Sequence, residues 1–402
     1  MKNLADHDSF ATGVPHETFA QMRAEAPLHW TPAFGGMKGF WSLTRYDDIM
    51  AAQRQPELFS SAQGIRIEDQ TREEYLARRT FQETDPPEHS ATRRTVNPAF
   101  AKPVVAKFAP LIDELAKDIV TEALREPEFD GVDRIAKRLP MLMLGRILGV
   151  PEADLDWLVD RGDALIGNTD PDFTDTVIDK VDTDAYRMMP FRSPAGVELY
   201  DYAADVLDGA RPITDDGILA RVKDEMPKRD FQNFFCLLVA AGNDTTRYSI
   251  AMALHLLATQ PGLLETLRTE DVLDTAPDEI IRLAAPTLHF RRTATEDTEL
   301  HGQTIAKGDK VLLWFVSGCR DDAQFEDPHT ANLARTPNRH LAFGQGGPHV
   351  CLGMWLAKLE LRAVLREIAA RVKHIDPTGA PTWTRSNFIC GVKSLPIRPV
   401  LA

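Results

Sequence analysis

A long apolar segment with helical spacing and a polar middle constrains this chain more than any other feature. Residues 231–260 read FQNFFCLLVAAGNDTTRYSIAMALHLLATQ, with apolar side chains at the period of one helix. The middle, residues 242–246, holds a glycine, which costs about 1 kcal/mol relative to alanine, and poor helix formers. Threonine hydroxyls there can bond the carbonyl of the preceding turn, and an acid beside an alcohol, Asp244 and Thr245, can relay protons. Because both flanks are apolar, we expect a buried helix with a functional turn rather than a solvated helix break.

Helical patterns dominate the remaining chain, and short strand-like segments lie near both ends. Helical spacing recurs near residue 47 and at 104–124, 199–207 and 355–372. Strand-like alternation with glycine turns or an extended pattern recurs at 28–45, 298–315 and 386–400. No repeat, low-complexity tract or Gly/Ser linker separates these parts, so the sequence predicts one mainly α-helical domain with small β-sheets over residues 1–402.

Charge and hydropathy narrow the class of protein. The 402 residues include 60 acidic and 46 basic side chains, giving a formal charge of −14, and lack a dense Lys/Arg run, which argues against nucleic acid as a partner. The first residues show no basic segment followed by an apolar one, and no apolar stretch reaches the ~20 residues that span a bilayer. We therefore expect a cytoplasmic protein without a membrane anchor.

A glycine-rich loop, RHLAFGQGGPHVCLG at 339–353, places Cys351 directly before a helical pattern. The four cysteines lie 83, 32 and 39 positions apart, which excludes CxxC zinc or redox spacing and CxxCH haem attachment. Nearby backbone N–H groups and the helix dipole favour a thiolate here, either as a metal ligand or as a nucleophile with His349 as its base. The alternative for an isolated residue is a buried apolar cysteine at a helix start.

Three further motifs carry charged side chains. Glu279 and Arg282 lie three residues apart in APDEIIRLAAP, which alone would indicate a surface ion pair. His89 and Arg93 lie four apart after a Pro-Pro helix entry, as a solvated cationic face or as a site for carboxylates. Arg292 in HFRRTATED precedes a strand, where either an anionic ligand group or a surface acid would be its partner.

In their order and separations, these motifs together resemble those of the cytochrome P-450 family, the haem-thiolate monooxygenases, over essentially the whole chain. The resemblance implies that family's fold, with haem b between the distal helix at 231–260 and the proximal cysteine loop and helix. Cys351 would be the axial thiolate of the haem iron, with O2 as co-substrate. A thiolate ligand pushes electron density onto iron and favours O–O cleavage.

The same resemblance gives individual residues roles. Asp244 and Thr245 match the acid and alcohol that support proton delivery to dioxygen, and Glu279 and Arg282 match a structural pair on the proximal side. The haem-contacting positions, whose basic members suit propionates, are His89, Arg93, Arg292, Phe343, His349 and Gly353. The substrate-pocket positions are Leu237, Ala240, Ala241, Leu288, His289, Phe290, Phe388 and Ile389. His289 has the alternative of a satisfied histidine that points away from the pocket.

The sequence departs from the family pattern at two places. Phe343 and Cys351 differ by eight positions rather than seven, so we expect a different loop path around the same ligand. Thr330 takes the place where an arginine or histidine commonly completes the Glu-x-x-Arg network, so either His329 substitutes or the network is shorter.

The resemblance further implies a monooxygenase that inserts one oxygen atom from O2 into an apolar molecule, by C–H hydroxylation of a terpenoid, sterol or alkyl chain. We expect electrons from NAD(P)H through a ferredoxin reductase and a ferredoxin that docks near Arg335, Arg339 and Lys358. The alternatives are a peroxide-driven peroxygenase and a non-catalytic haem-binding sensor or carrier. The acid and alcohol pair favours the dioxygen-using enzyme over both.

Overall fold

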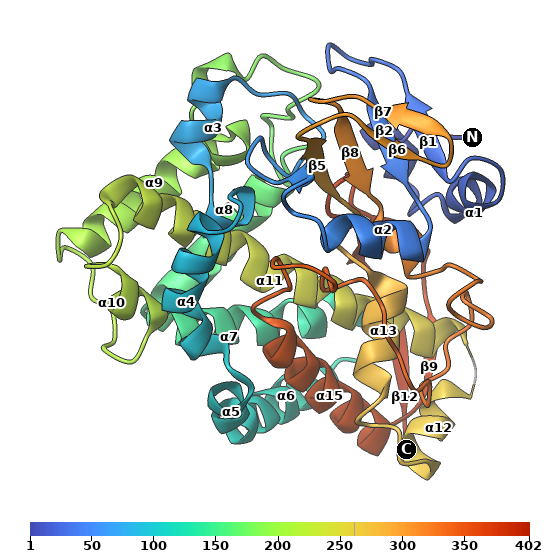
Figure 1. The fold of residues 1–402 in the computed structure, drawn as a ribbon. Coiled ribbons are helices and arrows are strands. Elements are labelled where there is room, and N and C mark those ends of the chain that lie inside the picture. Colours follow the sequence, from blue (N-terminus) through green and yellow to red (C-terminus); the bar gives the residue numbers. More distant parts are fainter. Residues whose placement is uncertain (261) are drawn as a thin grey trace.

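The computed structural model describes residues 1–260 and 262–402, which form a mainly helical molecule with four small β-sheets (Figure 1), as the sequence predicts. The helices are α1 (His16–Glu25), α2 (Tyr46–Gln53), α3 (Arg72–Arg78), α4 (Glu88–Phe100), α5 (Lys102–Val105), α6 (Ala109–Ala123), α7 (Arg138–Leu148), α8 (Leu155–Ile166), α9 (Pro194–Leu207), α10 (Ile218–Val222), α11 (Lys228–Thr259), α12 (Leu263–Thr269), α13 (Ala276–Ala284), α14 (Phe315–Gly318) and α15 (Met354–Arg371). The strands are β1 (Leu28–Thr31), β2 (Phe40–Leu43), β3 (Phe59–Ser60), β4 (Phe129–Asp130), β5 (Phe290–Ala294), β6 (Thr298–Leu300), β7 (Gln303–Ile305), β8 (Lys310–Leu313), β9 (Val372–Pro377), β10 (Thr382–Trp383), β11 (Val392–Ser394) and β12 (Pro396–Leu401).

Helix α11 runs unbroken through the middle of the molecule and contacts α7, α8, α9, α13 and α15 (Figure 1). Its polar turn is buried, with Asn243 and Asp244 each 1% exposed, so the solvated helix break is excluded. The hydroxyl of Thr245 donates to the carbonyl of Ala241 at 3.0 Å, which gives it a hydrogen-bond partner inside the helix. The polar turn therefore lies among apolar layers, where each polar group needs a specific partner.

A five-stranded sheet in the order β1-β2-β8-β5-β3 lies beside the helices. The predicted hairpin at 28–45 is confirmed as antiparallel β1 and β2, and β8 pairs with β2 in parallel and with β5 antiparallel. Strand β8 is buried along its whole length, in keeping with its central position. Phe290 at the start of β5 and Thr287 just before it face the same interior space as Thr245 in the middle of α11.

The predicted helix at 104–124 is divided in the structure. Helix α5 ends at Val105, a 3₁₀ turn follows at Ala106–Phe108, and α6 begins at Ala109 with Pro110 in its first turn. Proline is best tolerated in the first turn because it lacks the N–H that a helix interior needs, which favours a start of α6 at this position. In the described part of the chain, no helix has the length and apolar character needed to cross a membrane.

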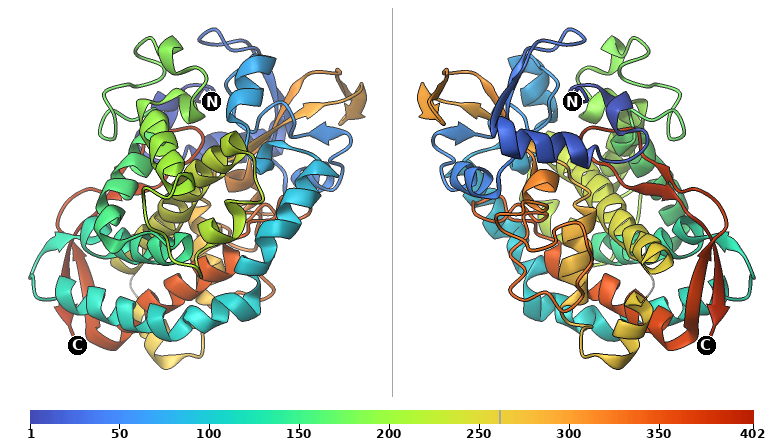
Figure 2. Two further views of the ribbon diagram at one scale, coloured as in Figure 1. Left: turned by 90° about the vertical axis from the view of Figure 1, so that its left-hand side faces the viewer. Right: turned by 90° about the vertical axis from the view of Figure 1, so that its right-hand side faces the viewer.

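The connection between α8 and α9, residues 167–193, contains only short 3₁₀ turns. It contacts β11 and the turn before it, where Asp170 binds Lys393 of β11 at 2.7 Å and Asp179 binds Arg385 of the turn at 2.7 Å. Figure 2 shows the strands β9 and β12 at the edge of the molecule far from the β6–β7 hairpin. The α8–α9 connection thus joins the helical layer to the end of the chain.

Candidate active site

Two adjacent cavities lie against the polar turn of α11. The first, which we call the cysteine cavity, encloses about 190 Å³ between α4, α11 and the loop at 339–353. The second, the outer cavity, encloses about 140 Å³ and extends beneath α3 and the α8–α9 connection. Both cavities are lined by Gln82, Leu237, Ala241, Thr245, Thr287 and Phe290. A group that fills one cavity therefore faces the contents of the other.

The cysteine loop keeps its hydrogen bond despite the extra residue. The amide of Cys351 donates to the carbonyl of Phe343 at 2.9 Å. Within the loop, Gly347 lies so close to α2 that a Cβ would come within 2.1 Å of the Gln53 carbonyl. Gln53 also donates to the carbonyl of Gln345 at 2.6 Å. The loop is thus held against α2 while the Phe343–Cys351 hydrogen bond remains in place.

The sulfur of Cys351 faces the cysteine cavity, and the side chain owes its exposure to that cavity. Burial raises the pKa of the Cys351 thiol, although the amides of Gly353 and Met354 and the charge of Arg93 oppose this effect. A metal cation at the sulfur would deprotonate it outright. His349 makes its one ring hydrogen bond to Ser61 at 3.2 Å, and among the described residues none joins it to the sulfur, so a Cys/His nucleophile is not supported.

A basic cluster lines the same cavity. The rings of His89 and His349 lie 4.1 Å apart, and three of their four nitrogens are buried without a partner. Burial and the charges of Arg93 and Arg292 lower the pKa of His89 to about 4 and that of His349 to about 2. Arg93 lines the cavity, whereas Arg292 lies behind the lining, 3% exposed. Unpartnered donors with two guanidinium groups nearby fit the two carboxylates of a haem, so the residues present suit this cofactor.

The polar turn of α11 directs its acid and its alcohol to opposite sides. Thr245 lines both cavities, whereas Asp244 is outside both linings and lies 2.5 Å from Arg247. Arg247 also binds Asp163 of α8 at 2.7 Å, and Lys137 binds the other oxygen of Asp163 at 3.2 Å. Burial and the neighbouring Asp163 raise the pKa of Asp244 to about 7, against the opposing charge of Arg247. The protonated form of Asp244 is therefore favoured more than that of an exposed aspartate.

Glu279 and Arg282 form a buried pair on α13, both 0% exposed. Arg282 donates to both carboxylate oxygens of Glu279 at 2.8 Å, and also to the carbonyl of Cys319 at 2.7 Å. The isolated surface ion pair is thereby excluded. These bonds connect α13 to the chain that leads into the cysteine loop.

Arg335 completes this network, contrary to both expectations for the segment near Thr330. Its Nε binds Glu279 at 3.1 Å, and the amide of Asn338 donates to the same oxygen at 3.0 Å. Neither Thr330 nor His329 donates to Glu279. The prediction from the sequence pattern is wrong because the loop folds back, so that Arg335, five positions after Thr330, reaches the Glu279 carboxylate.

The three residues expected near a docked ferredoxin differ in their exposure and in their ion pairs. Arg335 is 12% exposed and bound to Glu279, so it is unsuited to contact a partner protein. Lys358 is 24% exposed and binds Asp278 at 2.6 Å. Arg339 alone of the three is exposed, beside a surface hollow formed with α2. The proposed docking surface is therefore reduced to the neighbourhood of Arg339.

Six of the eight predicted substrate-pocket residues line the cavities: Leu237, Ala240, Ala241, Phe290, Phe388 and Ile389. The prediction is wrong for Leu288 and His289. Leu288 packs in the core beneath the five-stranded sheet. His289 bonds the carbonyl of Asn387 at 3.0 Å and packs 4.6 Å from Trp314, and burial lowers its pKa to about 3. His289 thus lies outside both cavity linings, as the alternative states, but it is only partly satisfied, because its Nε2 is buried without a hydrogen-bond partner.

No motif predicts the polar residues that line the outer cavity. These come from the segment between β3 and α4 and from the end of the α8–α9 connection: Arg66, Glu68, Gln70, Arg78, Glu83 and Arg192. They follow no motif spacing, and the fold alone brings them together.

A cysteine that faces a cavity, a basic cluster that suits two carboxylates and a hydroxyl-bearing helix across the cavity define a haem-thiolate site. Comparison with known proteins agrees. Residues 206–387 match the family Cytochrome P-450. A methyl-branched lipid omega-hydroxylase of Mycobacterium tuberculosis is 35% identical over 397 residues, covering 94% of this chain and 90% of that protein. A linalool 8-monooxygenase of Pseudomonas putida is 34% identical over 411 residues, covering 98% and 97%.

A solved structure supports the same conclusion. The cytochrome P-450 of Mycobacterium marinum in complex with pseudoionone superposes with a TM-score of 0.86 at 33% identity, over 95% of this chain and 94% of that one. This chain belongs to the cytochrome P-450 family and is a monooxygenase. Members of the family bind haem through a cysteine thiolate and use O2.

Proposed function

We propose that this enzyme hydroxylates an unactivated C–H bond of an apolar small molecule of the terpenoid, sterol or alkyl class. The observation that carries the proposal is the apolar wall shared by the two cavities, with Leu237, Ala241 and Phe290 around Thr245. A hydrocarbon in the outer cavity would lie directly against a cofactor in the cysteine cavity. The names of the two relatives, a lipid hydroxylase and a linalool monooxygenase, support this substrate class.

Haem, when bound, supplies the oxidising chemistry: one atom of O2 enters the C–H bond and the other leaves as water, with two electrons and two protons consumed. Cys351 would hold the iron, and the amides of Gly353 and Met354 would moderate the charge on its sulfur. His89, Arg93, His349 and Arg292 would hold the propionates. Phe343 would pack beside the sulfur, since it lines the cavity and its carbonyl accepts from the Cys351 amide.

The protons would come through the polar turn of α11. Asp244 can hold a proton near pH 7 on the side of the helix that faces α8, and Thr245 presents a hydroxyl on the cavity side. The Thr245 hydroxyl donates to the Ala241 carbonyl, so its lone pairs remain free to accept a hydrogen bond in the cavity. The pair would thus connect a proton store with the reaction space.

Electrons would come from NAD(P)H through a ferredoxin reductase and a ferredoxin. The exposed Arg339, beside the surface hollow near the cysteine loop, would contact an acidic ferredoxin despite the negative total charge of the chain. A cytoplasmic enzyme is the consistent choice because NAD(P)H is supplied in that compartment.

The first test is the spectrum of the ferrous protein with carbon monoxide. Wild type should show the long-wavelength band of a thiolate-ligated haem, and Cys351→Ser should lose it. Cys236→Ser, which changes a cysteine of the outer cavity, is the matched control and should retain the band. Retention of the band by Cys351→Ser would refute the assignment of the ligand.

Turnover distinguishes the alternatives. With O2, NAD(P)H, a reductase and a ferredoxin, wild type should form hydroxylated product, and Thr245→Ala should divert electrons to hydrogen peroxide. Equal product from hydrogen peroxide alone would favour the peroxygenase. A thiolate band without product under either condition would favour the sensor or carrier.

A further inference from the structure

The outer cavity has an apolar part and a charged part. Leu237, Ala240 and Phe290 line it near Thr245, together with Phe388 from the C-terminal turn. The charged part is lined by three guanidinium groups and two carboxylates, from Arg66, Arg78, Arg192, Glu68 and Glu83. A cavity that binds only a hydrocarbon does not need charged side chains in its wall. Burial of charged groups without a partner is unfavourable, so their presence here calls for an explanation.

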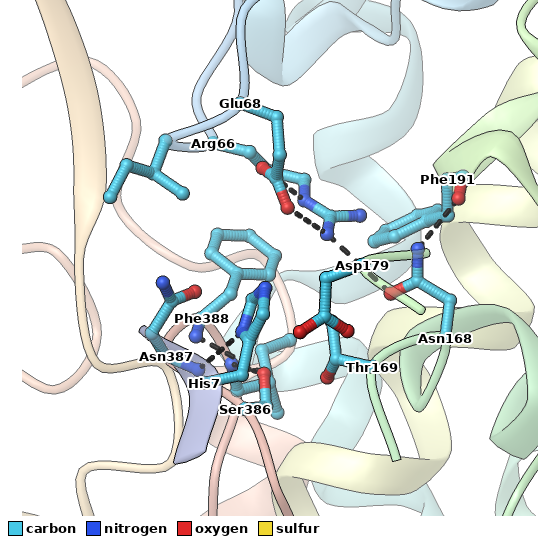
Figure 3. A network of polar contacts seen from close by, with 12 residues as sticks. His7, Arg66, Glu68, Asn168, Thr169, Asp179, Phe191, Ser386, Asn387 and Phe388 are labelled. Atoms are coloured by element: carbon cyan, nitrogen blue, oxygen red, sulfur yellow. Dashed lines mark hydrogen bonds and ion pairs between the residues drawn. The ribbon is translucent and has the colours of Figure 1, made fainter. Parts of the chain in front are cut away.

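Arg66 is already neutralised by a neighbour. Its guanidinium binds Glu68 through two hydrogen bonds, at 2.7 and 3.2 Å (Figure 3). The rings of Phe191 and Phe388 flank it, with centroids 4.7 and 5.2 Å from the guanidinium carbon. Asn168 holds Phe191 in place by donating to its carbonyl at 2.6 Å. The Arg66–Glu68 ion pair is therefore neutral overall, and it offers no free charge to an ionic ligand.

Arg78 differs because all its acceptors are neutral. It donates to the side-chain oxygen of Gln70 at 2.8 and 3.1 Å and to the carbonyl of Arg187 at 3.1 Å. In residues 1–260 and 262–402, no carboxylate lies within ion-pair distance of its guanidinium. Glu74 and Glu83 attract this half-buried guanidinium only from beyond ion-pair distance, so Arg78 can still accept a carboxylate as a direct partner.

Arg192 adds to this excess of positive charge. Its ion pair is with Asp184, an exposed carboxylate at 3.3 Å, and its Nε is buried without a partner. Phe191 and Arg192 both have left-handed backbone conformations, with φ of 56° and 49°, which are unfavourable for side chains other than glycine. The remaining acid, Glu83, accepts from the Thr80 amide, and burial raises its pKa. Strained backbone at a cavity wall is common where a ligand is clamped.

We propose that Arg78 and Arg192 bind the carboxylate head of a substrate whose hydrocarbon part extends past Leu237 and Phe290 to Thr245. Arginine binds carboxylates through strong charge-assisted hydrogen bonds, and a carboxylate head would give Arg78 the charged acceptor that its present hydrogen bonds lack. The inference rests on the proposed function and narrows its substrate class to amphiphilic acids. Oxidation would then fall on the part of the chain remote from the carboxylate.

Calorimetric titration with dodecanoate and with methyl dodecanoate tests the head site, because the two probes share one hydrocarbon chain and differ in the head group, a charged carboxylate in one and a neutral ester in the other. We expect dodecanoate to bind at least about tenfold more tightly than the ester. Arg78→Gln should abolish that preference by weakening dodecanoate alone, and Arg192→Gln should reduce it. Arg72→Gln, an exposed arginine on the same helix, is the matched control and should bind both probes as wild type does.

Equal affinities of wild type for the two probes would overturn the proposal, as would equal weakening of both by Arg78→Gln. Tight binding of 1-dodecanol would also overturn it, because a hydroxyl would then suffice. The carbon monoxide band of each variant confirms that the protein is folded, and Arg78→Lys provides a second variant that should retain part of the preference. A wild type without that band would refute the proposed function, while the calorimetric preference would still decide the head site.

Discussion

Two buried carboxylates on neighbouring helices have opposite surroundings. Glu279 accepts bonds from Arg282, Arg335, Asn338 and the amide of Asn332, and these donors hold its pKa below the usual value although burial opposes them. Asp244 shares one guanidinium with Asp163, and its pKa is raised to about 7. The number of donors available to each acid thus decides whether it holds a permanent charge or an exchangeable proton.

Removal of the charge at Glu279 should have the largest effect. Glu279→Gln leaves two buried arginines without their carboxylate, and we expect a loss of about 3–5 kcal/mol in the free energy of unfolding, because an uncompensated buried charge is costly. Chemical denaturation measures this loss, and the carbon monoxide band reports haem retention. Glu270→Gln, at an exposed acid near the end of α12, should change stability by less than about 0.5 kcal/mol. A Glu279 variant as stable as this control would contradict the structural role.

The same isosteric change at Asp244 should leave the fold intact but should slow the reaction. Asp244→Asn should reduce coupled product formation on the order of 100-fold, as loss of a general acid does. The activity profile near pH 7 should lose the titration that comes from Asp244. Initial rates between pH 5.5 and 8.5 with a supplied ferredoxin measure both effects. Unchanged coupled turnover would disprove the proton route.

The pH dependence of the free energy of unfolding should reveal the proton on Asp244 without any measurement of activity. Its folded pKa of about 7 lies above the unfolded value, so the native state binds an extra proton between those two pKa values. This contribution to stability is fully present below the unfolded pKa and is lost as pH rises through 7. The unfolding free energy of Asp244→Asn relative to wild type should therefore rise between pH 5 and pH 8. A constant difference would show that Asp244 holds no such proton.

Replacement of Arg335 should lower the free energy of unfolding less than replacement of Glu279 and more than replacement of Thr330. Arg335→Ala removes one charged hydrogen bond from Glu279 and should cost about 1.5–3 kcal/mol, while Thr330→Ala should remain within about 0.5 kcal/mol. Thermal unfolding of the two variants under one set of conditions compares them. Equal shifts would mean that the network extends to Thr330 after all.

The smallest effect should be at the surface. Arg339→Glu should raise the KM for ferredoxin several-fold at low ionic strength, and the difference should shrink at high salt because screening weakens exposed charges. Lys307→Glu, in the exposed turn after β7, carries the same charge change as a control. Identical ferredoxin kinetics for wild type and Arg339→Glu would remove Arg339 from the docking surface.

Features governed by local spacing could be predicted from the sequence. The helix at 231–260, the hairpin at 28–45 and the helix after the cysteine loop all depend on periodicity within one segment, and the structure contains all three. The motif residues His89, Phe343 and Cys351 meet at one cavity because their order and spacing reflect the family's fold.

Features governed by distant packing could not be predicted. His289 is directed by the Asn387 carbonyl, 98 positions away in the chain, and no local pattern shows on which side of the strand it lies. Arg335 reaches Glu279 through a loop whose path the motif spacing does not encode. The cations of the outer cavity, such as Arg78 and Arg192, come from two segments that only the fold brings together.

The contact of the α8–α9 connection with the C-terminal turn has a consequence for ligand residence time. Asp170 is 1% exposed and binds Lys393 at 2.7 Å and the amide of Arg385 at 2.8 Å, while Asp179 binds the Arg385 guanidinium. Ile178 of the connection and Phe388 of the C-terminal turn both line the outer cavity, so a molecule that leaves between these two segments has to wait until the contacts separate. Because Asp170 is buried, salt should screen its ion pair only weakly, and the residence time of such a molecule should depend little on ionic strength.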